Sequence, residues 1–260
     1  MYQTYNANVA AKPGEATKNI RNIVAHQILH QPRSLQTRIG PSEIGNPCDH
    51  CLAARLAGWE KQEDGIPLAT TIGTGYHALM EHFFNTWEAE QSETNPEWRH
   101  RYLMEQQVTV GKIGNQEITG STDLLDLAAG MTIDYKVVGK TSFDNYRING
   151  PSPTYQIQAH LYAKGWNDAG VKVDTVAIWF IPKMAIDLRS SHWWLEPYQP
   201  LIAQNALQRA NRLWDAIQEA QDATEYIKNL PRQPGCWDCR KYPDRPIPID
   251  PLFDLNNPHQ

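Results

Sequence analysis

The pattern of hydrophobic and polar positions divides the chain into helical and strand-like segments. Apolar residues spaced three and four apart predict helices at 19–31, 52–58, 67–89, 152–168 and 198–228. Short runs rich in β-branched and aromatic residues predict strands at 102–110, 117–128, 132–138, 173–181 and 188–195. Helices followed by a mixed central sheet with a crossing helix indicate an α/β (α+β) fold.

The same pattern predicts one folded domain with two extensions. Residues 1–40 read as an N-terminal extension, loose over its first 18 residues and carrying the short helix at 19–31. Residues 41–242 form the domain, and 243–260 a proline-rich tail. With 260 residues, 41% of them hydrophobic, and nine tryptophans, the chain can build one sizeable core.

Charged residues gather on the strand pair 117–128 and 132–138. If Ala129-Gly130 forms a two-residue turn, Asp123 lies opposite Lys136, and Asp134 shares that face because side chains alternate along a strand. A three-residue turn would instead put Asp126 beside Asp134. Crowded carboxylates need a counter-charge, and a divalent cation would provide it. The alternative is a solvated, charged strand face.

Two carboxylates, a lysine and a Gln-x-x-x-Tyr follow in the order that a metal-dependent phosphodiester-cutting site requires. Asp123 and Asp134 are the predicted ligands of Mg²⁺ or Mn²⁺, and Lys136 would steer the phosphate or the metal-bound water. Gln158 and Tyr162, four residues apart, share a helical face and would hold a phosphate or position the lysine. The alternative for this pair is a polar surface stripe, with Tyr155, Gln156 and His160 as competitors for its roles.

His77 is a candidate metal ligand on the predicted helix 67–89. Glu81 lies four residues further along the same side, and Glu105, at the start of the first strand, is a further candidate. Gly73 and Gly75 are expected to let this helix approach the sheet closely. The alternative for His77 is an ordinary packed or surface histidine.

Four cysteines form two Cys-x-x-Cys pairs. Their spacing suits a single four-thiolate metal site, made of Cys48, Cys51, Cys236 and Cys239. Zinc is the common generic occupant, and a disulfide is the weaker explanation in a cytosolic chain. His50 lies inside the first pair and is surplus to four thiolates. The shared ion would join the C-terminal region to the start of the domain.

Composition excludes some functions and leaves others open. No apolar run reaches the length of a membrane span, and the first residues lack the apolar core of a signal peptide, so we expect a cytoplasmic protein without a membrane partner. The net charge of −5 is not typical of a nucleic-acid-binding protein. Acidic metal ligands and an acidic exterior can nevertheless coexist with a local basic groove.

In the order of its motifs the chain resembles the PD-(D/E)XK nuclease superfamily, and within it the RecB-like exonucleases. These include the nuclease domains of bacterial recombination helicases and CRISPR-associated nucleases. Gly120 to Asp123 matches G-x-x-D, Asp134 to Lys136 matches D-x-K, and Gln158 to Tyr162 matches Q-x-x-x-Y, with His77 as the upstream histidine. The resemblance spans residues 41–242 and implies a restriction-endonuclease-like core, with a mixed central sheet flanked by helices.

The resemblance also implies ligands and a cofactor. His77 would contact a metal and favour Mn²⁺, and the backbone carbonyl of Tyr135 would be a further ligand. The cysteines would hold a [4Fe–4S] cluster, although the family divides them one and three where this chain divides them two and two. Structural Zn²⁺ is the alternative.

These observations predict a metal-dependent DNA exonuclease acting on single strands or DNA ends in recombination or replication. Without a nucleotide-binding loop, the chain resembles phage or CRISPR-associated members, which would work in the host cytoplasm, and recombination or CRISPR-type proteins are possible partners. The alternatives are a non-catalytic, zinc-stapled nucleic-acid-binding module and a nuclease that acts on RNA.

Overall fold

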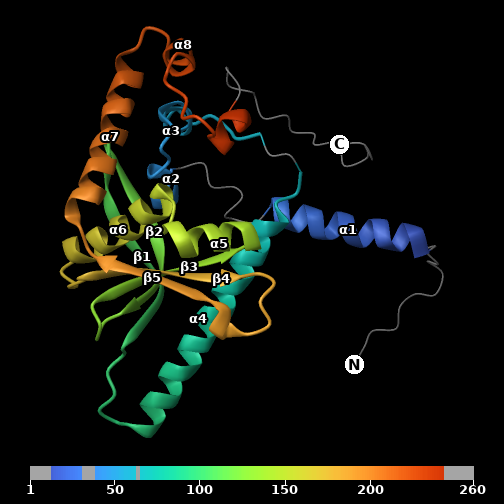
Figure 1. Cartoon of the computed structure of the whole chain (residues 1–260), viewed down its shortest axis with the longest axis vertical. Helices are drawn as coiled ribbons and strands as arrows, with labels where there is room; N and C mark the ends of the chain where they lie inside the picture. Colours follow the sequence, from blue (N-terminus) through green and yellow to red (C-terminus); the bar gives the residue numbers. More distant parts are fainter. Residues whose placement is uncertain (1–12, 31–38, 63–64, 243–260) are drawn as a thin grey trace.

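The computed structural model of the chain describes residues 13–30, 39–62 and 65–242 (Figure 1). The helices are α1 (Pro13–Leu29), α2 (Pro41–Ile44), α3 (Asp49–Leu56), α4 (Leu68–Thr94), α5 (Lys140–Asn149), α6 (Pro153–Asp168), α7 (Pro200–Glu219) and α8 (Ala223–Lys228). Two short 3-10 helices are η1 (Leu188–Ser190) and η2 (Trp237–Lys241). The strands are β1 (Tyr102–Ile113), β2 (Gln116–Asp126), β3 (Met131–Val138), β4 (Thr175–Pro182) and β5 (His192–Pro197).

The five strands form one mixed sheet in the order β1-β2-β3-β4-β5. Strands β1 to β3 are antiparallel neighbours, and β5 is antiparallel to β4. Only the central pair β3 and β4 is parallel, because the chain crosses over between them through α5 and α6. The predicted α/β class, with a mixed sheet flanked by helices, is confirmed.

Helices cover the two faces of the sheet unequally. Figure 1 shows the long helix α4 crossing one face, while α5, α6 and α7 lie on the other. Each face has its own hydrophobic cluster, a small one under α4 around Ile133 and Tyr135 and a large one under α6 and α7. Because strand side chains alternate, residues 133 and 135 point to α4, whereas 134 and 136 belong to the α6 face.

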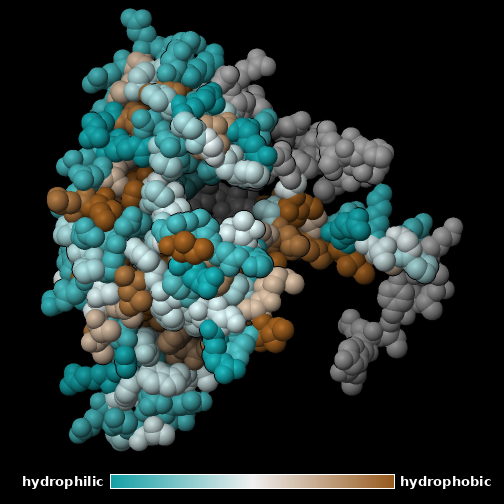
Figure 2. All heavy atoms as spheres, in the orientation of Figure 1, coloured by the Kyte–Doolittle hydropathy of each residue, from teal (hydrophilic) through white to brown (hydrophobic). Residues whose placement is uncertain are grey.

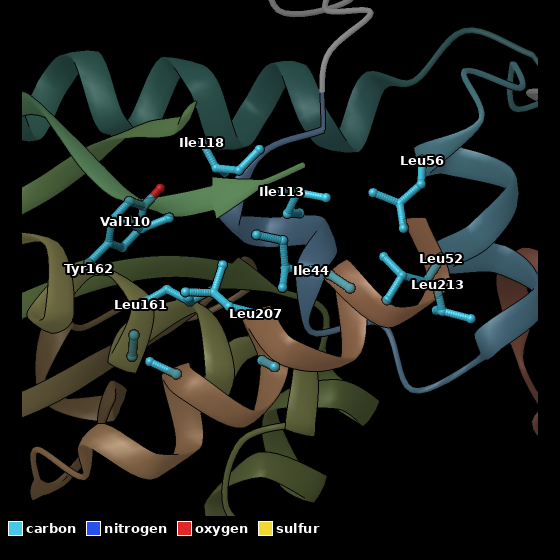
Figure 3. Close-up of a cluster of buried hydrophobic side chains, with 14 of the residues drawn as sticks. Ile44, Leu52, Leu56, Val110, Ile113, Ile118, Leu161, Tyr162, Leu207 and Leu213 are labelled. Atoms are coloured by element: carbon cyan, nitrogen blue, oxygen red, sulfur yellow. The ribbon is translucent and has the colours of Figure 1, made fainter. Parts of the chain in front are cut away.

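The large cluster joins segments that are far apart in the sequence. Figure 3 shows side chains from α2, α3, β1, β2, α6 and α7 converging on it, among them Ile44, Leu52, Val110, Leu161 and Leu207. In α7 the buried positions recur at helical spacing, at Ala203, Ala206, Leu207, Ala210, Leu213 and Ile217. This cluster fixes α2 and α3, which precede the sheet, against the helix that follows it.

Local signals explain where several helices begin. Ser152 caps α6, its hydroxyl accepting from the Tyr155 amide, and Pro153 occupies the first helical position. The predicted helix 198–228 is in fact two helices, because Asp222 caps α8 by accepting from the Glu225 amide. Helix α5 was not predicted, since its residues form no apolar stripe and none of them is fully buried.

The N-terminal helix differs from its prediction. It begins at Pro13, inside the stretch expected to be loose, and ends at Leu29. The apolar side chains of Ile20, Ile23 and Val24 are 50–62% exposed, and Figure 2 shows hydrophobic spheres along this helix. Residues 1–12, 31–38 and the predicted tail 243–260 lie outside the described residues.

The predicted two-residue turn between β2 and β3 is wrong, and so is the three-residue alternative. Four residues, 127–130, connect the strands, and Leu124 pairs with Ile133. The reason is Asp126, whose carboxylate accepts from the amides of Ala128 and Ala129, while Gly130 takes a left-handed conformation at φ 58°. Asp126 also pairs with Arg101, so it serves the turn rather than the charged cluster.

Candidate functional site

Asp123 lies where β2 and β3 stop pairing. The last paired residues are Leu124 and Ile133, and beyond them the Asp123 carboxylate takes over the role of a backbone acceptor. Its Oδ2 accepts from the Tyr135 amide at 2.7 Å, and its Oδ1 lies 3.3 Å from Nδ1 of His77 on α4. One oxygen therefore fixes the carboxylate to β3, and the other faces a candidate metal ligand.

Glu105 belongs to the same cluster. Its Oε1 lies 3.5 Å from His77 Nδ1, and its Oε2 accepts from the Ser121 hydroxyl at 2.7 Å. Glu105 is the one non-glycine residue with positive φ, +48°, in the described ranges. Left-handed backbone costs a residue with a Cβ about 1–2 kcal/mol, and such strain is concentrated at functional sites.

His77 supplies a counter-charge to the two carboxylates of this cluster. Burial by itself lowers the pKa of His77, but the hydrogen bonds that it donates to Asp123 and Glu105 and the charge of Asp123 raise that pKa to about 10. The imidazole is therefore protonated at neutral pH when no metal is bound. Two carboxylates beside a histidine need a positive charge, whichever group supplies it.

Asp134 and Lys136 form a buried pair beside this cluster. The Lys136 ammonium contacts the Asp134 carboxylate, whose two oxygens accept no well-aligned hydrogen bond from the described residues. Burial raises the pKa of Asp134, with Lys136 opposing and Asp123 adding to the rise. Burial lowers the pKa of Lys136, but the charges of Asp134 and Asp123 raise it more, so the side chain stays an ammonium.

Helix α6 contributes the Gln-x-x-x-Tyr pair, and neither residue is on the surface. Gln158 and Tyr162 are each 6% exposed. The Tyr162 ring lies against Gly120, where a Cβ would come within 3.1 Å of Tyr162 and 2.7 Å of Pro41. The glycine of the G-x-x-D motif thus admits close packing three residues before Asp123.

The competitors of this pair have other partners. Gln156 donates to Glu196 at 2.9 Å, and the buried His160 contacts the same carboxylate through Nε2. The Gln199 amide donates to His160 Nδ1, which assigns the proton to Nε2. Tyr155 does reach the site, since the Lys136 ammonium lies 4.9 Å from the centre of its ring.

The donor set fits a divalent cation. One ligand atom each from His77, Glu105 and Asp123 lies within 4.8 Å of the others, and the Asp134 oxygens that lack hydrogen bonds lie close enough for their charge to act on this group. Oxygen ligands suit Mg²⁺ and Mn²⁺, and the imidazole favours Mn²⁺. Glu81 is not among the gathered ligands, and metal binding by the Tyr135 carbonyl stays a prediction.

The expectation for Gly73 and Gly75 is wrong. A Cβ built on either glycine meets nothing within 4 Å, so neither glycine is needed for a close approach. The residues of α4 that do pack are Met80, which is buried, and Tyr76 and Phe84, which lie against the small cluster. His77 is positioned by this packing.

The four cysteines come together, although one pair lies near the start of the domain in sequence and the other near its end. Cys48 Sγ lies 3.4 Å from Cys239 Sγ, and Cys51 Sγ lies 3.5 Å from Cys239 Sγ and 3.7 Å from Cys236 Sγ. His50 Nδ1 lies 3.9 Å from Cys51 Sγ. The sulfurs of Cys48, Cys51 and Cys239, together with a nitrogen of His50, form a second group that can hold a metal ion.

The thiols affect one another's ionisation. Burial and the neighbouring thiols raise the pKa of Cys51, and burial likewise raises the pKa of Cys239 to about 11. Burial also acts against ionisation of Cys48, but the backbone amides of Gln233 and Cys51 bind its sulfur and lower its pKa. Without a cation the group cannot carry several thiolates at once.

A row of aromatic rings crosses the α4 face of the sheet, starting at His77. The His77 and Tyr135 rings are 5.8 Å apart, Tyr135 and Trp179 are 6.0 Å apart, and Trp179 stacks on Trp193 at 4.7 Å and 9°. Tyr135, Trp179 and Trp193 are directly paired on β3, β4 and β5. Tyr135 is buried, whereas Trp193 on the edge strand is 42% exposed.

Sequence reasoning missed two parts of this arrangement. The Ser121 contact with Glu105 depends on how separate elements pack, which no local pattern records. The aromatic row depends on the register of three strands. The presence of an aromatic residue in each of the three strands was its only sequence signal.

Comparisons with known proteins add little. No protein-family model matches the sequence, and no curated protein matches it. Among solved structures, the crystal structure of a putative exonuclease from Eubacterium rectale is similar, with 14% sequence identity and a TM-score of 0.44, covering 85% of this chain and 94% of that one. A likeness at this TM-score assigns neither a family nor a function to the chain. In the described ranges, no helix combines the length and apolarity needed to cross a membrane.

Proposed function

We propose that this protein is a metal-dependent DNA exonuclease of the RecB-like, PD-(D/E)XK type that hydrolyses phosphodiester bonds in single strands or at DNA ends. One observation carries the proposal. Residues predicted from three separate motifs, His77, Asp123 and the Asp134–Lys136 pair, meet at one point where two strands separate. The structure adds Glu105 to them. A solvated strand face would not bury these carboxylates against an imidazole and an ammonium.

The ligands of the proposed Mg²⁺ or Mn²⁺ would be Asp123, Asp134 and His77, with Glu105 as a further oxygen donor. When bound, such an ion neutralises the phosphate and lowers the pKa of a bound water. The chain holds the ligands in advance, through the Tyr135 amide on Asp123 and the Ser121 hydroxyl on Glu105. Preorganised ligands need little rearrangement at the moment of reaction.

Lys136 would act on the phosphate. Its ammonium contacts Asp134 and the face of the Tyr155 ring. An ammonium at this place would stabilise the charge that develops on the phosphate in the transition state. The Gln158 side chain, buried on α6, would orient the substrate or Lys136.

The aromatic row supports a single-stranded substrate. Every base has a face that can stack on tryptophan, and in a duplex those faces are already stacked inside the helix. Trp193 stands on the edge strand and stacks on Trp179 alone among the described rings. A base stacked on its outer face would continue a row that leads to His77.

Asp134→Ala tests the proposal. We expect DNA cleavage with Mn²⁺ or Mg²⁺ to fall by about 10³-fold or more, because a ligand of the reacting centre is lost. Cleavage of end-labelled single and double strands would be measured with each metal and with chelator. Asp144→Ala is the matched control, since Asp144 is a surface carboxylate paired with Lys140.

Retention of activity by a folded Asp134→Ala chain would rule out the proposed active site. If the wild-type chain binds DNA but cleaves neither DNA nor RNA with any of these metals, the non-catalytic binding module is the better description. Cleavage of RNA in preference to DNA would retain the site and change its substrate.

Trp193→Ala tests the strand preference. We expect single-stranded DNA affinity to fall about 5- to 100-fold, which corresponds to one lost base–aromatic stack, with duplex affinity little changed. Binding would be measured without divalent metal, so that no cleavage occurs. Trp237→Ala, which removes another exposed tryptophan, should bind like the wild type. Equal losses on single strands and duplexes would contradict stacking on Trp193.

A further inference from the structure

We infer that one tetrahedral zinc ion, rather than a [4Fe–4S] cluster, is the resident metal of the cysteine group formed by Cys48, Cys51, Cys236 and Cys239. The inference goes beyond the proposed nuclease activity and does not depend on it. It concerns a site with no carboxylate ligand, built from the start of α3 and the segment around η2.

The distances between the sulfurs carry the inference. Zn–S bonds of about 2.3 Å at tetrahedral angles place neighbouring sulfurs about 3.8 Å apart. The three measured separations are 3.4, 3.5 and 3.7 Å, and they connect all four cysteines through Cys51 and Cys239. Thiolates this close can share one ion.

A cubane cluster needs a different arrangement. In a [4Fe–4S] centre each cysteine binds its own iron at a separate corner, with the irons and sulfides lying between the thiolates. The thiolates are therefore held well beyond mutual contact. Here Cys48 and Cys239 are in contact, and no space for irons and sulfides separates them. The residues present do not fit the cluster in this arrangement.

The surrounding contacts hold the short spacing in place. Cys48 and Cys51 are the N-cap and first-turn residues of α3, with the Cys48 amide donating to Asn46. The Asn46 side chain in turn donates to Asp238, which lies between the two C-terminal cysteines. The His50 amide binds the Pro231 carbonyl, and the Gln62 amide binds the Lys241 carbonyl. Spreading the sulfurs around a cubane would break these contacts between the two segments.

His50 gives the site a neighbour beyond its four thiolates. It is fully buried, and its Nδ1 lies 3.9 Å from Cys51 Sγ. An imidazole N–H beside a metal-bound thiolate is a common outer-shell partner of zinc sites, because it compensates the excess negative charge of four thiolates.

The test is the metal content of the full chain, purified anaerobically from cells supplied with both iron and zinc. We expect about one zinc per chain, no inorganic sulfide and no visible absorbance. Replacing zinc by Co²⁺ should produce the visible bands of tetrahedral cobalt–thiolate coordination. Each of the four cysteine-to-serine variants should lose most of its zinc and melt at a lower temperature. Trp237→Ala, in the same Cys-x-x-Cys segment but exposed, should keep its zinc.

Several results would overturn the inference. About four irons and four sulfides per chain, with a brown protein, would assign the cluster instead. A metal-free wild-type chain whose serine variants melt at the wild-type temperature would show that there is no shared site. The metal and sulfide content of the wild-type chain distinguishes zinc from the cluster even if a serine variant fails to fold. Measuring zinc in Asp134→Ala as well separates this result from the fate of the nuclease proposal.

Discussion

Asp123 is placed by hydrogen bonds that no strand register reveals. The motif G-x-x-D identified the residue, but the expected partner across the hairpin was Lys136. In the structure one Asp123 oxygen replaces a missing backbone acceptor for Tyr135, and the other is left for His77. Residue types were therefore readable from the sequence, whereas the direction of each oxygen was not.

The position of Glu105 was still harder to predict from the sequence than the orientation of Asp123. Its type and position made it only an outlying candidate, because a strand residue with left-handed backbone cannot be recognised from neighbouring residues. The conformation is stabilised by a contact with Ser121 on the next strand. To place Glu105 beside Ser121 needed the pairing of β1 with β2, which only the folded chain provides.

His77→Ala should weaken Mn²⁺-supported cleavage more than Mg²⁺-supported cleavage, because imidazole prefers the softer ion. Losing an outer-shell partner already costs about 10- to 100-fold in metal affinity, so loss of a direct ligand should raise the half-saturating Mn²⁺ concentration by at least that. The measurement is a titration of cleavage with each metal. His82→Ala, exposed on the same helix, is the control. Equal shifts for both metals would show that His77 only orients the carboxylates.

At the scale of elements, periodic segments were predictable and the joints between them were not. Helices α6 and α7 and the five strands follow from their apolar spacing and caps, as the structure confirms. Helix α5 lacks such a stripe. The predicted helix 198–228 divides into α7 and α8, because Asp222 caps the start of α8. The β2–β3 connection depends on side-chain capping by Asp126, so counting turn residues gave the wrong length.

Gly120 and Gly75 should respond oppositely to alanine. Gly120→Ala places a Cβ 2.7 Å from Pro41 and 3.1 Å from Tyr162, and such overpacking costs about 1–3 kcal/mol of stability. Gly75→Ala meets no atom within 4 Å on α4 and should stabilise the chain by about 0.5–1 kcal/mol.

Denaturant unfolding of both variants measures the difference. Gly120→Ala should also lower cleavage, because the displaced strand carries Asp123 three residues later. Equal stabilities of the two variants would show that Tyr162 does not pack on Gly120 in solution.

At the scale of the whole molecule, the motif order predicted the sheet class but not the two-faced arrangement around it. His77 reaches the site from α4, and the Gln158 helix packs on the opposite face, so the sheet separates two groups that meet only where its strands diverge. The net charge of −5 gave no hint of this, since it sums over a surface and the site is local. Two cysteine pairs did predict that distant segments meet.

The contact between the segments around Cys48 and Cys239 has a mechanical consequence. Residues near 48 and near 239 are in contact, so a pull applied to the two ends of the described domain would enter the fold at neighbouring points. The load would pass through the cysteine group and the short contacts beside it, and the five strands would bear almost none of it. If the proposed zinc ion is bound, metal–sulfur bonds would set the force at which the chain yields. The sheet, and the site between β2 and β3, would then stay undistorted until those bonds break.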